Sequence, residues 1–326
     1  MIRTAIIGYG NLGRSVEKVI ADQADMELVG VFSRRDQLDT DARVLPAANV
    51  ADYKDEVDVL FVCLGSATDV PEQGAELAKH FNTVDTYDNH AELPNHRAKL
   101  AEATAEGETL AIMATGWDPG LFSLNRVLGA SIIPGGDQKT FWGPGLSQGH
   151  SDAVRRVAGV KRGVQYTKPN PEAIEAVKKG EGADIKSKEA HLRHCFIVAE
   201  ETGDEAKDNE VKEQIRETIV NMPDYFVGYE TVVDFISEEE FERDHQGMPH
   251  GGVVITQGRA GYTDHVIEFS LDLERNPDFT AAVQVAYGRA AHRLREAGET
   301  GVRTPFEIAP YLLAQESLDD LVANSL

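Results

Sequence analysis

Six residues near the N-terminus have the types and spacing of a dinucleotide-binding loop. Residues 8–13, Gly8-Tyr9-Gly10-Asn11-Leu12-Gly13, fit the pattern G-x-G-x-x-G, follow the strand-like run 4–7 and open a helical pattern over 12–22. In such a loop the first glycine permits a tight turn, the second admits a pyrophosphate, and the third lets helix pack on strand. Amide groups at the helix start then bind phosphate. We therefore expect all six residues to contact a dinucleotide, and a turn without a ligand is the alternative.

The end of the second expected strand indicates which dinucleotide is bound. Sites for NAD carry Asp or Glu about twenty residues after the glycines, to bond the ribose 2′-hydroxyl. This chain has Ser33-Arg34-Arg35 at that point. Paired guanidiniums bind a phosphate through charge-assisted hydrogen bonds, so we predict NADP(H) as the cofactor. The alternative is a solvated arginine pair without a ligand.

Polar loops follow the next strands, at the sheet edge where ligands bind in open α/β folds. The residues expected beside the cofactor are Cys63, Leu64, Gly65, Ser66 and Ala67 after one strand, and Thr86, Tyr87 and Asp88 after the next. Asp118 follows a further strand. A carboxylate in these positions can hold a substrate ammonium or accept its proton, although each Asp alone is equally well a helix cap or turn residue. Two of them at neighbouring strand ends favour a cationic group on the substrate.

The elements that must position these groups alternate between strand and helix over the first 120 residues. The strand-like runs are 4–7, 28–32, 57–64, 83–86 and 110–114, and the helical patterns are 12–22, 71–80 and 96–106. This alternation predicts an α/β fold with a Rossmann-type, doubly wound parallel sheet.

After residue 120 the pattern changes, with strand-like runs at 194–199, 229–236, 252–257 and 265–271 and few helices between them. We expect an α+β domain with an open mixed sheet there. The predicted division is a dinucleotide-binding domain over 1–120, a second domain over 121–284 that binds substrate, and a C-terminal segment, about 285–326, that packs back on the first domain.

Composition limits the possible partners and the location. The chain has 326 residues, enough for about two domains, with 32 Lys and Arg against 55 Asp and Glu, a net charge of −23. Such acidity argues against nucleic acid and anionic membranes as partners. No apolar run reaches a membrane span, no signal-peptide core forms before Gly8, and two cysteines are too few for a disulfide framework, so we expect a cytoplasmic protein. The histidines match no zinc spacing, so no metal is expected.

Longer motifs make the chain resemble the meso-diaminopimelate dehydrogenases, NADPH-dependent enzymes of bacterial lysine synthesis. The most specific are Phe-Trp-Gly-Pro-Gly-Leu-Ser-Gln-Gly-His-Ser at 141–151 and Gly-Met-Pro-His-Gly-Gly at 247–252. Further matches lie at 8–15, 32–35, 84–90, 115–120, 222–229 and 275–280. The resemblance therefore runs almost from end to end.

The resemblance implies a reaction and a role for each site residue. The D-configured carbon of meso-2,6-diaminopimelate gives a hydride to NADP, and the imine is hydrolysed to L-2-amino-6-oxopimelate, which cyclises to tetrahydrodipicolinate, and ammonia, in a reversible reaction. Asp88 and Asp118 are the implied catalytic residues. The implied substrate-binding residues are Asp88, Trp117, Asp118, Trp142, Gln148 and Gly149, most of them around the D-centre, and Thr167, Arg193, His250 and Asn276 around the L-centre. The second domain is also expected to form a homodimer contact.

Charge supports the second group. An Arg fork suits a distal carboxylate, with Thr and His completing its hydrogen bonds, and an Asn amide oxygen suits a distal ammonium. One alternative is another two-domain NADP oxidoreductase, acting on a sugar or an amino-aldehyde. Many such sugar enzymes carry Glu-Lys-Pro after the fifth strand, where this chain has Asp85-Thr86-Tyr87-Asp88. Another alternative is a non-catalytic NADP sensor, which would not need anchors for both ends of one ligand.

Overall fold

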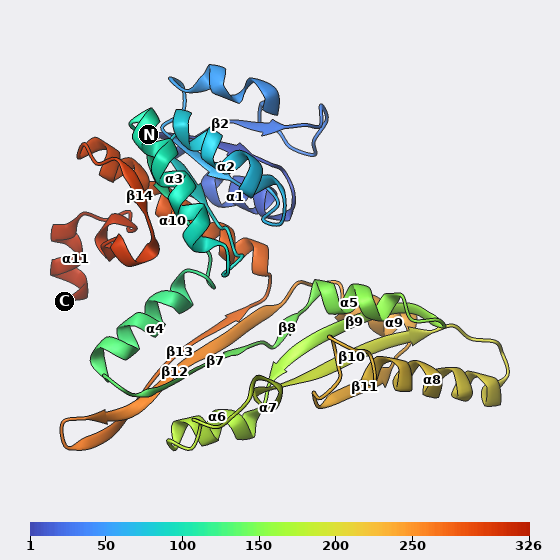
Figure 1. Ribbon diagram of the computed structural model, residues 1–326. Coiled ribbons are helices and arrows are strands. Elements are labelled where there is room, and N and C mark those ends of the chain that lie inside the picture. The colour runs from blue at the N-terminus through green and yellow to red at the C-terminus, as the bar shows by residue number, and fades with distance from the viewer. The chain divides into compact units, whose positions relative to one another are not determined.

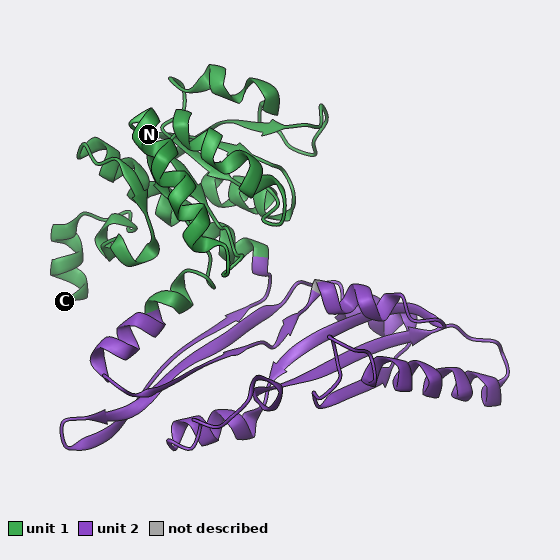
Figure 2. Cartoon of the chain, in the orientation of Figure 1, with its two compact units in different colours: residues 1–124, 277–326 green, residues 125–276 purple. Residues whose placement is uncertain are grey.

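The chain folds into two compact units in a computed structural model, which describes residues 1–326 apart from the side chain of Gln148. Unit 1 contains Met1–Leu124 and Pro277–Leu326, and unit 2 contains Asn125–Asn276 (Figure 2). The expected boundaries were residues 120 and 285. The second boundary lies earlier because the helix Asn276–Glu296 places residues of its first half, such as Ala281 and Val283, in the core of unit 1.

Unit 1 is built on a seven-stranded sheet in the order β14-β6-β5-β4-β1-β2-β3, in which every pairing is parallel. The strands are β1 (Ile2–Ile7), β2 (Met26–Ser33), β3 (Val44–Pro46), β4 (Val59–Val62), β5 (Thr83–Asp85), β6 (Leu110–Ile112) and β14 (Gly301–Arg303). The predicted doubly wound sheet is thus confirmed. Because β1 pairs with both β2 and β4, the strand order reverses there, and this is where ligands bind in such sheets.

Helices cover both faces of this sheet, as a parallel sheet requires. They are α1 (Asn11–Ala21), α2 (Asp69–His80), α3 (Leu93–Gly107) and α10 (Asn276–Glu296). The last helix, α11 (Leu318–Ser325), contains no buried residue. Alternate residues of β1 enter opposite apolar clusters. Ile6 packs in the cluster that contains residues of α1 and α10, whereas Ile7 packs in the cluster that contains residues of α2. Short 3-10 helices lie at 47–53, 305–307 and 310–312.

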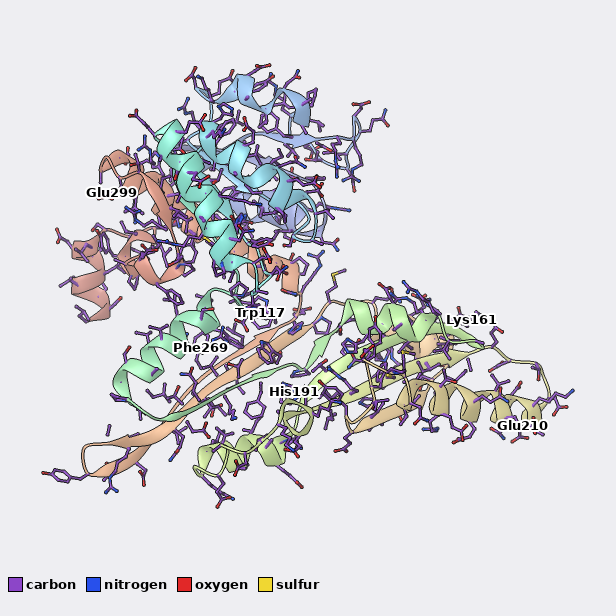
Figure 3. The ribbon with its side chains drawn as sticks, viewed as in Figure 1. Trp117, Lys161, His191, Glu210, Phe269 and Glu299 are labelled. Atoms are coloured by element: carbon purple, nitrogen blue, oxygen red, sulfur yellow. The ribbon has the colours of Figure 1, made fainter. Side chains whose placement is uncertain are left out.

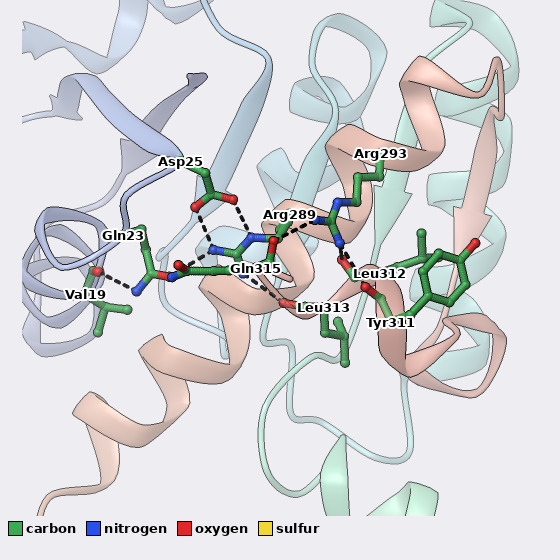
Figure 4. Close-up of polar contacts among 9 residues, drawn as sticks. All are labelled: Val19, Gln23, Asp25, Arg289, Arg293, Tyr311, Leu312, Leu313 and Gln315. Carbon is green, nitrogen blue, oxygen red and sulfur yellow. Dashed lines mark hydrogen bonds and ion pairs between the residues drawn. The ribbon is translucent and has the colours of Figure 1, made fainter. Parts of the chain in front are cut away.

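A buried guanidinium fixes the returning C-terminal segment to the rest of unit 1 (Figure 4). Arg289 of α10 is 3% exposed. Its Nε and Nη2 donate to the two carboxylate oxygens of Asp25 at 2.5 and 2.8 Å, and its Nη1 donates to the carbonyl of Leu313 at 2.8 Å. Arg293, one turn further along, donates to the Tyr311 carbonyl at 2.9 Å. The chain after α10 is therefore held by side chains of α10 itself.

Unit 2 contains two sheets where we expected one (Figure 1). The four-stranded sheet runs β11-β10-β9-β8, with β8 (Gly145–Leu146), β9 (Val160–Pro169), β10 (His191–Ala199) and β11 (Thr231–Phe235). It is mixed, because β10 and β11 are parallel and the other pairs antiparallel. The three-stranded sheet is antiparallel and runs β13-β12-β7, with β7 (Asp137–Trp142), β12 (His250–Ala260) and β13 (Thr263–Leu273).

The remaining helices belong to this part of the chain. They are α4 (Leu121–Ile132), which begins at the end of unit 1, α5 (Gln148–Arg155), α6 (Pro171–Lys178), α7 (Ser187–Ala190), α8 (Glu205–Val220) and α9 (Glu238–Asp244). Among the helices described here, none is both long enough and apolar enough to span a membrane.

The Arg289–Asp25 contact predicts a pH-dependent loss of stability. The hydrogen bond from Arg289 holds the pKa of Asp25 below its usual value. Such a carboxylate stabilises the fold above its unfolded pKa of about 3.9, and the contribution is lost as the pH falls through the lower folded pKa. Arg289→Leu should cost about 1–2 kcal/mol at pH 7, after allowance for solvent screening at the partly exposed Asp25.

Urea denaturation at pH 7 and at pH 3 checks this expectation. The difference between wild type and Arg289→Leu should narrow on acidification, and Arg295→Leu is the control because that guanidinium makes an exposed contact on the same helix. A difference that stays constant over this range would show that ionised Asp25 contributes nothing.

Candidate active site

The glycine loop has the geometry that each of its glycines was expected to supply. Gly8 has φ +93°, and a Cβ there would lie 2.6 Å from the Cys63 carbonyl oxygen. A Cβ on Gly13 would lie 2.2 Å from the Gly8 carbonyl oxygen, so α1 packs directly on the turn. A Cβ on Gly10 would meet nothing within 4 Å. Gly8 and Gly13 are thus required by the fold, whereas Gly10 leaves open space in front of the helix.

A cleft of about 310 Å³ lies where the ends of β1, β2 and β4 meet. It is lined by Ile7, Gly8, Tyr9, Gly10, Phe32, Ser33, Arg34, Arg35, Ala47, Cys63, Leu64, Gly65, Asp69 and Gln73. Most of the predicted cofactor residues are therefore brought together. Eight of the predicted cofactor residues do not line the described cleft. They are Asn11, Leu12 and Gly13 near the start of α1, Ser66 and Ala67 between β4 and α2, and Thr86, Tyr87 and Asp88 after β5. Asp69, Ala47 and Gln73 were missed from the sequence, which gives them no distinctive pattern.

The two arginines at the end of β2 differ in how they are held. The Arg35 Nη2 donates to the Tyr9 carbonyl at 2.5 Å, and the Arg35 backbone N–H donates to Ser33 Oγ at 2.9 Å. Arg34 extends into solvent, with its Nη1 3.4 Å from Asp69 Oδ1. Gly10, as N-cap of α1, supplies no side chain to cap the helix. Two cations, uncapped helix amides and the space beside Gly10 fit the phosphates of NADP.

Cys63 lines the cleft but is not a reactive thiol. It is buried, and burial raises the pKa of its thiol far above the ordinary value. Its Sγ lies 3.7 Å from Gln284 Oε1. The Gln284 amide nitrogen donates to the carbonyls of Val62 at 3.2 Å and Val84 at 2.8 Å. Gln284 of α10 therefore ties together the ends of β4 and β5.

Asp88 and Asp118 lie on two loops at the same edge of the sheet. Asp88 is exposed in the loop after β5, and Asp118 is partly buried in the loop after β6. The neighbouring Trp117, labelled in Figure 3, packs edge-on against Phe122 with ring centroids 5.2 Å apart, and its carbonyl accepts the Phe122 N–H at 2.8 Å. Buried Asp85, which the sequence did not single out, makes hydrogen bonds to both loops.

A second group of predicted residues meets in unit 2. Thr167 on β9 pairs with Gly145 on one side and with Arg193 on the other. The Arg193 Nη1 donates to the Thr167 hydroxyl, and its guanidinium carbon lies 4.2 Å from the centre of the Tyr229 ring. The His250 ring packs on Gly145, where a Cβ would lie 2.7 Å away. These contacts place Thr167, Arg193 and His250 in one cluster.

Asn276 joins this cluster through its backbone. Its N–H donates to the carbonyl of Met248 at 2.9 Å, two residues before His250. Trp142 lies at the end of β7, where its N–H donates to His191 Nε2 at 2.9 Å and its ring stacks on that imidazole at 5.8 Å. Burial lowers the pKa of His191, in keeping with a neutral ring that accepts a hydrogen bond. Gly149 is exposed on α5, and the side chain of Gln148 lies outside the described part of the chain.

Two buried polar atoms of this cluster have no partner among the described residues, Arg193 Nε and Gln165 Oε1. Gln165 is fully buried, and its amide nitrogen lies 3.4 Å from Thr167 Oγ1. A buried donor or acceptor without a partner costs free energy, so ligand or water is expected beside it. A carboxylate matches the guanidinium N–H. Gln165 was missed because β9 itself was not predicted.

Within the part of the chain that the structure describes, no group of three or more His, Cys, Asp or Glu side chains is placed to hold an ion.

Comparison with known proteins decides the family. The sequence profile of the diaminopimelic acid dehydrogenase C-terminal domain matches residues 116–275. The meso-diaminopimelate D-dehydrogenase of Corynebacterium glutamicum is 53% identical over 325 residues, which cover 100% of this chain and 99% of that protein. This chain belongs to the diaminopimelate dehydrogenase family.

Other members of the family agree with this assignment. The enzyme of Lysinibacillus sphaericus is 49% identical, over 98% of both chains. The C. glutamicum DAP dehydrogenase in complex with DAP matches with a TM-score of 0.86 and 54% identity, over 100% of this chain and 99% of the other. An engineered D-amino acid dehydrogenase bound to NADP+ matches with a TM-score of 0.81 and 53% identity, over the same shares. The resemblance found from the motifs is therefore confirmed, and the chain is an NADP-dependent amino acid dehydrogenase.

The glycine loop generates a prediction that separates folding from binding. Gly10→Ala adds a Cβ in open space, so the melting temperature of the protein without cofactor should stay within about 2 °C of the wild-type value. Affinity for NADP+ should fall at least tenfold, roughly 1.4 kcal/mol, because the added methyl group lies where the pyrophosphate approaches the backbone.

Gly13→Ala is the contrast, since its Cβ would collide with a backbone oxygen and lower the melting temperature. Thermal denaturation and a fluorescence titration with NADP+ measure both effects. Wild-type affinity in Gly10→Ala would remove residue 10 from the phosphate site.

Proposed function

We propose that the chain catalyses the reversible, NADP-dependent oxidative deamination of the D-centre of meso-2,6-diaminopimelate, to L-2-amino-6-oxopimelate and ammonia. The observation that carries the substrate is the half-buried Arg193 side chain, whose buried Nε has no acceptor among the described residues and whose Nη1 donates to the Thr167 hydroxyl. An anionic ligand group satisfies that donor. Solved relatives in complex with DAP and with NADP+ support the same reading.

The cofactor contacts are distributed along the strand ends of unit 1. Ser33, Arg34 and Arg35 bind the 2′-phosphate, and residues 8–13 with the start of α1 bind the pyrophosphate. Residues 63–67 and 86–88 lie beside the remainder of the cofactor. When bound, NADP+ supplies the hydride acceptor for the D-configured carbon.

Asp88 and Asp118 handle the protons of the reaction. The substrate nitrogen reaches the site as an ammonium, and hydride leaves its carbon only after the nitrogen has lost a proton and regained its lone pair. One of the two carboxylates accepts that proton, directly or through a water. Water then adds to the imine carbon and gives a proton to a carboxylate. That proton passes to the nitrogen of the adduct, the C–N bond breaks to release ammonia, and the hydroxyl loses its proton to a carboxylate as the carbonyl forms. By resemblance to the family, we assign Trp117, Trp142, Gln148 and Gly149 to binding of the same substrate centre.

The L-centre is held by the cluster in unit 2. Arg193 and Thr167 bind its carboxylate, and the Asn276 amide oxygen accepts from its ammonium. Burial lowers the pKa of His250, and the Gly251 N–H donates to its Nδ1 at 2.9 Å. The Nδ1 also lies 3.2 Å from the Gly251 carbonyl. In the neutral tautomer that accepts the shorter bond from the Gly251 N–H, the hydrogen is on Nε2, which then serves as a donor to the carboxylate. Because buried polar groups reject a wrongly placed centre, this arrangement favours the meso isomer over the LL and DD isomers.

A homodimer in the cytoplasm is the assembly that we propose. Helix α4 exposes Val127, Leu128 and Ile132, at 48, 54 and 61% of their surface. Burial of such a group against a second copy of the chain is favourable at about 25 cal/mol per Å². Cys63 and Cys195 are both free thiols, in keeping with a reducing compartment.

Absorbance of NADPH is the direct test. Wild-type enzyme should reduce NADP+ with meso-diaminopimelate and remain nearly inactive with the LL isomer, with D-lysine and with a sugar panel. Activity with a sugar would favour a sugar dehydrogenase, and tight NADP+ binding without any turnover would favour a sensor.

The arginine pair predicts the cofactor preference. Arg34→Ala and Arg35→Ala should each weaken NADP+ at least tenfold and leave NAD+ affinity unchanged, because each charge-assisted hydrogen bond contributes roughly 1.5–3 kcal/mol. Isothermal titration with both dinucleotides measures the ratio. Equal losses for the two dinucleotides would refute the 2′-phosphate assignment.

The two ends of the substrate predict two kinetic signatures. Arg193→Ala should raise KM for meso-diaminopimelate roughly a hundredfold or more with little change in KM for NADP+, since a charged hydrogen-bonded pair is lost. Asp118→Asn should instead lower kcat about a hundredfold, because a general base is removed. Steady-state kinetics of both variants check these outcomes. An unchanged KM in Arg193→Ala, or wild-type turnover in Asp118→Asn, would remove that residue from its role.

A further inference from the structure

We propose that Asp85 and His96 are positioning residues that hold the loops of Asp88 and Asp118 in their reactive arrangement. This inference rests on the proposed function, because it assumes that these two loops carry the proton acceptors. Neither Asp85 nor His96 belongs to the groups that contact cofactor or substrate above.

The Asp85 carboxylate lies at the end of β5, is 4% exposed, and makes three hydrogen bonds. Its Oδ1 accepts the backbone N–H groups of Tyr87 and Ala114, both at 3.0 Å. Its Oδ2 lies 2.9 Å from His96 Nε2. Tyr87 is the residue before Asp88, and Ala114 is three residues before Trp117. One side chain thus bonds to the backbone of both loops.

The backbone of Asp85 makes a second connection between the loops. Its carbonyl accepts the Thr115 N–H at 3.0 Å and the Thr115 hydroxyl at 2.9 Å. Ala114 itself has φ +56°, a left-handed conformation that is strained for a residue with a Cβ. The bond from the Ala114 N–H to the Asp85 carboxylate offsets part of this strain. The loop therefore keeps its shape only while the carboxylate is in place.

His96 of α3 fixes the orientation of that carboxylate. An ionised carboxylate only accepts hydrogen bonds, so the imidazole donates to it from Nε2. The ring is buried and packs against the Tyr87 ring with centroids 4.5 Å apart. On the side of α2, Gly74 lies against the ring, because a Cβ there would be at an ordinary van der Waals distance, 3.4 Å, from His96 Cε1. The imidazole is held on both sides, and it holds the carboxylate in turn.

The cost of burial indicates what this pair does. The cost of removing the Asp85 carboxylate and the His96 imidazole from water offsets most of their mutual attraction. Two apolar side chains of similar volume would therefore stabilise the end of β5 as much as this polar pair does. A buried pair that bonds to two loops instead selects one loop conformation. Since a displacement of about 1 Å at reacting groups can lower a rate roughly a hundredfold, the effect should be on turnover.

The test compares two substitutions of His96. His96→Leu removes the donor to Asp85, whereas His96→Gln places an amide N–H where Nε2 lies. We expect kcat with meso-diaminopimelate to fall at least tenfold in His96→Leu and to recover to within about threefold in His96→Gln. Affinity for 2′,5′-ADP, which reaches only the arginine end of the cofactor site, should stay at the wild-type value in both. His80→Leu, a change of an exposed histidine on α2, is the matched control.

Amide hydrogen exchange gives a second measurement, which does not depend on catalysis. In His96→Leu, amide hydrogen exchange should accelerate at least tenfold in segments 86–92 and 113–118, and stay unchanged in 8–20. If His96→Leu does not fold, Asp85→Asn replaces it, because its amide oxygen still accepts from Tyr87 and Ala114, whereas its amide nitrogen no longer accepts a hydrogen bond from His96 Nε2. We expect at least a threefold loss of kcat in that variant.

The outcomes separate this inference from the proposed function. Wild-type kcat and exchange in His96→Leu would overturn the positioning role while the proposed function stands. Equal losses of kcat, 2′,5′-ADP affinity and melting temperature in the Leu and Gln variants would also overturn it, because they would show general destabilisation. A wild-type enzyme without activity on meso-diaminopimelate would refute the proposed function, and the exchange data would still decide whether His96 holds the loops.

Discussion

The close backbone contact between the glycine turn and its neighbours is the constraint on which unit 1 depends. Carbonyl oxygens of Cys63 and Gly8 occupy the positions where side chains of Gly8 and Gly13 would stand. This approach brings the start of α1 to the edge where β1 lies between β2 and β4. Arg34 and Arg35, which follow β2, then line the same cleft as the glycine loop. The candidate phosphate site therefore results from the close backbone packing of the glycine turn, and the guanidinium groups of Arg34 and Arg35 add positive charge to it.

Local charge, more than total charge, governs binding in this molecule. The chain carries a net charge of −23, yet the candidate anion sites are formed by single guanidiniums in defined contacts. Arg35 is fixed to the glycine loop, and Arg193 is fixed to Thr167 and lies against the Tyr229 ring. Arg289 shows a third use, where a buried guanidinium fastens a chain segment with no ligand involved. What separates Arg193 from Arg289 is an unpaired N–H, because all the nitrogens of Arg289 have partners.

The sequence allowed the sheet of unit 1 to be predicted because its central strands are continuous apolar runs between turn residues. Strands β3 and β14 were missed, since three residues at a sheet edge carry no periodic signal. The most consequential omission was β9. Gly163, Gln165 and Thr167 alternate with Val164 and Tyr166, but part of their own face is also buried, since Gln165 is fully buried and a Cβ on Gly163 would lie 2.8 Å from Val154. Small and polar residues on a buried face give no apolar signal, so the strand was not recognised. Thr167 was therefore identified only through the resemblance, and Gln165 was not identified at all.

Asp85 and His96 were missed for a different reason. Each is an ordinary residue in a predicted strand or helix, and only the fold shows that side chains 11 positions apart in the sequence make a 2.9 Å contact. The same principle applies to Arg193 and Thr167, which the antiparallel register of β9 and β10 places opposite one another. In both units a polar side chain on one strand or helix is fixed by a partner on another before any ligand is present. The residues proposed to contact the substrate are therefore ordered within each unit before the substrate binds. Because these side chains are already fixed, less conformational entropy is lost when they bind the two ends of a flexible molecule.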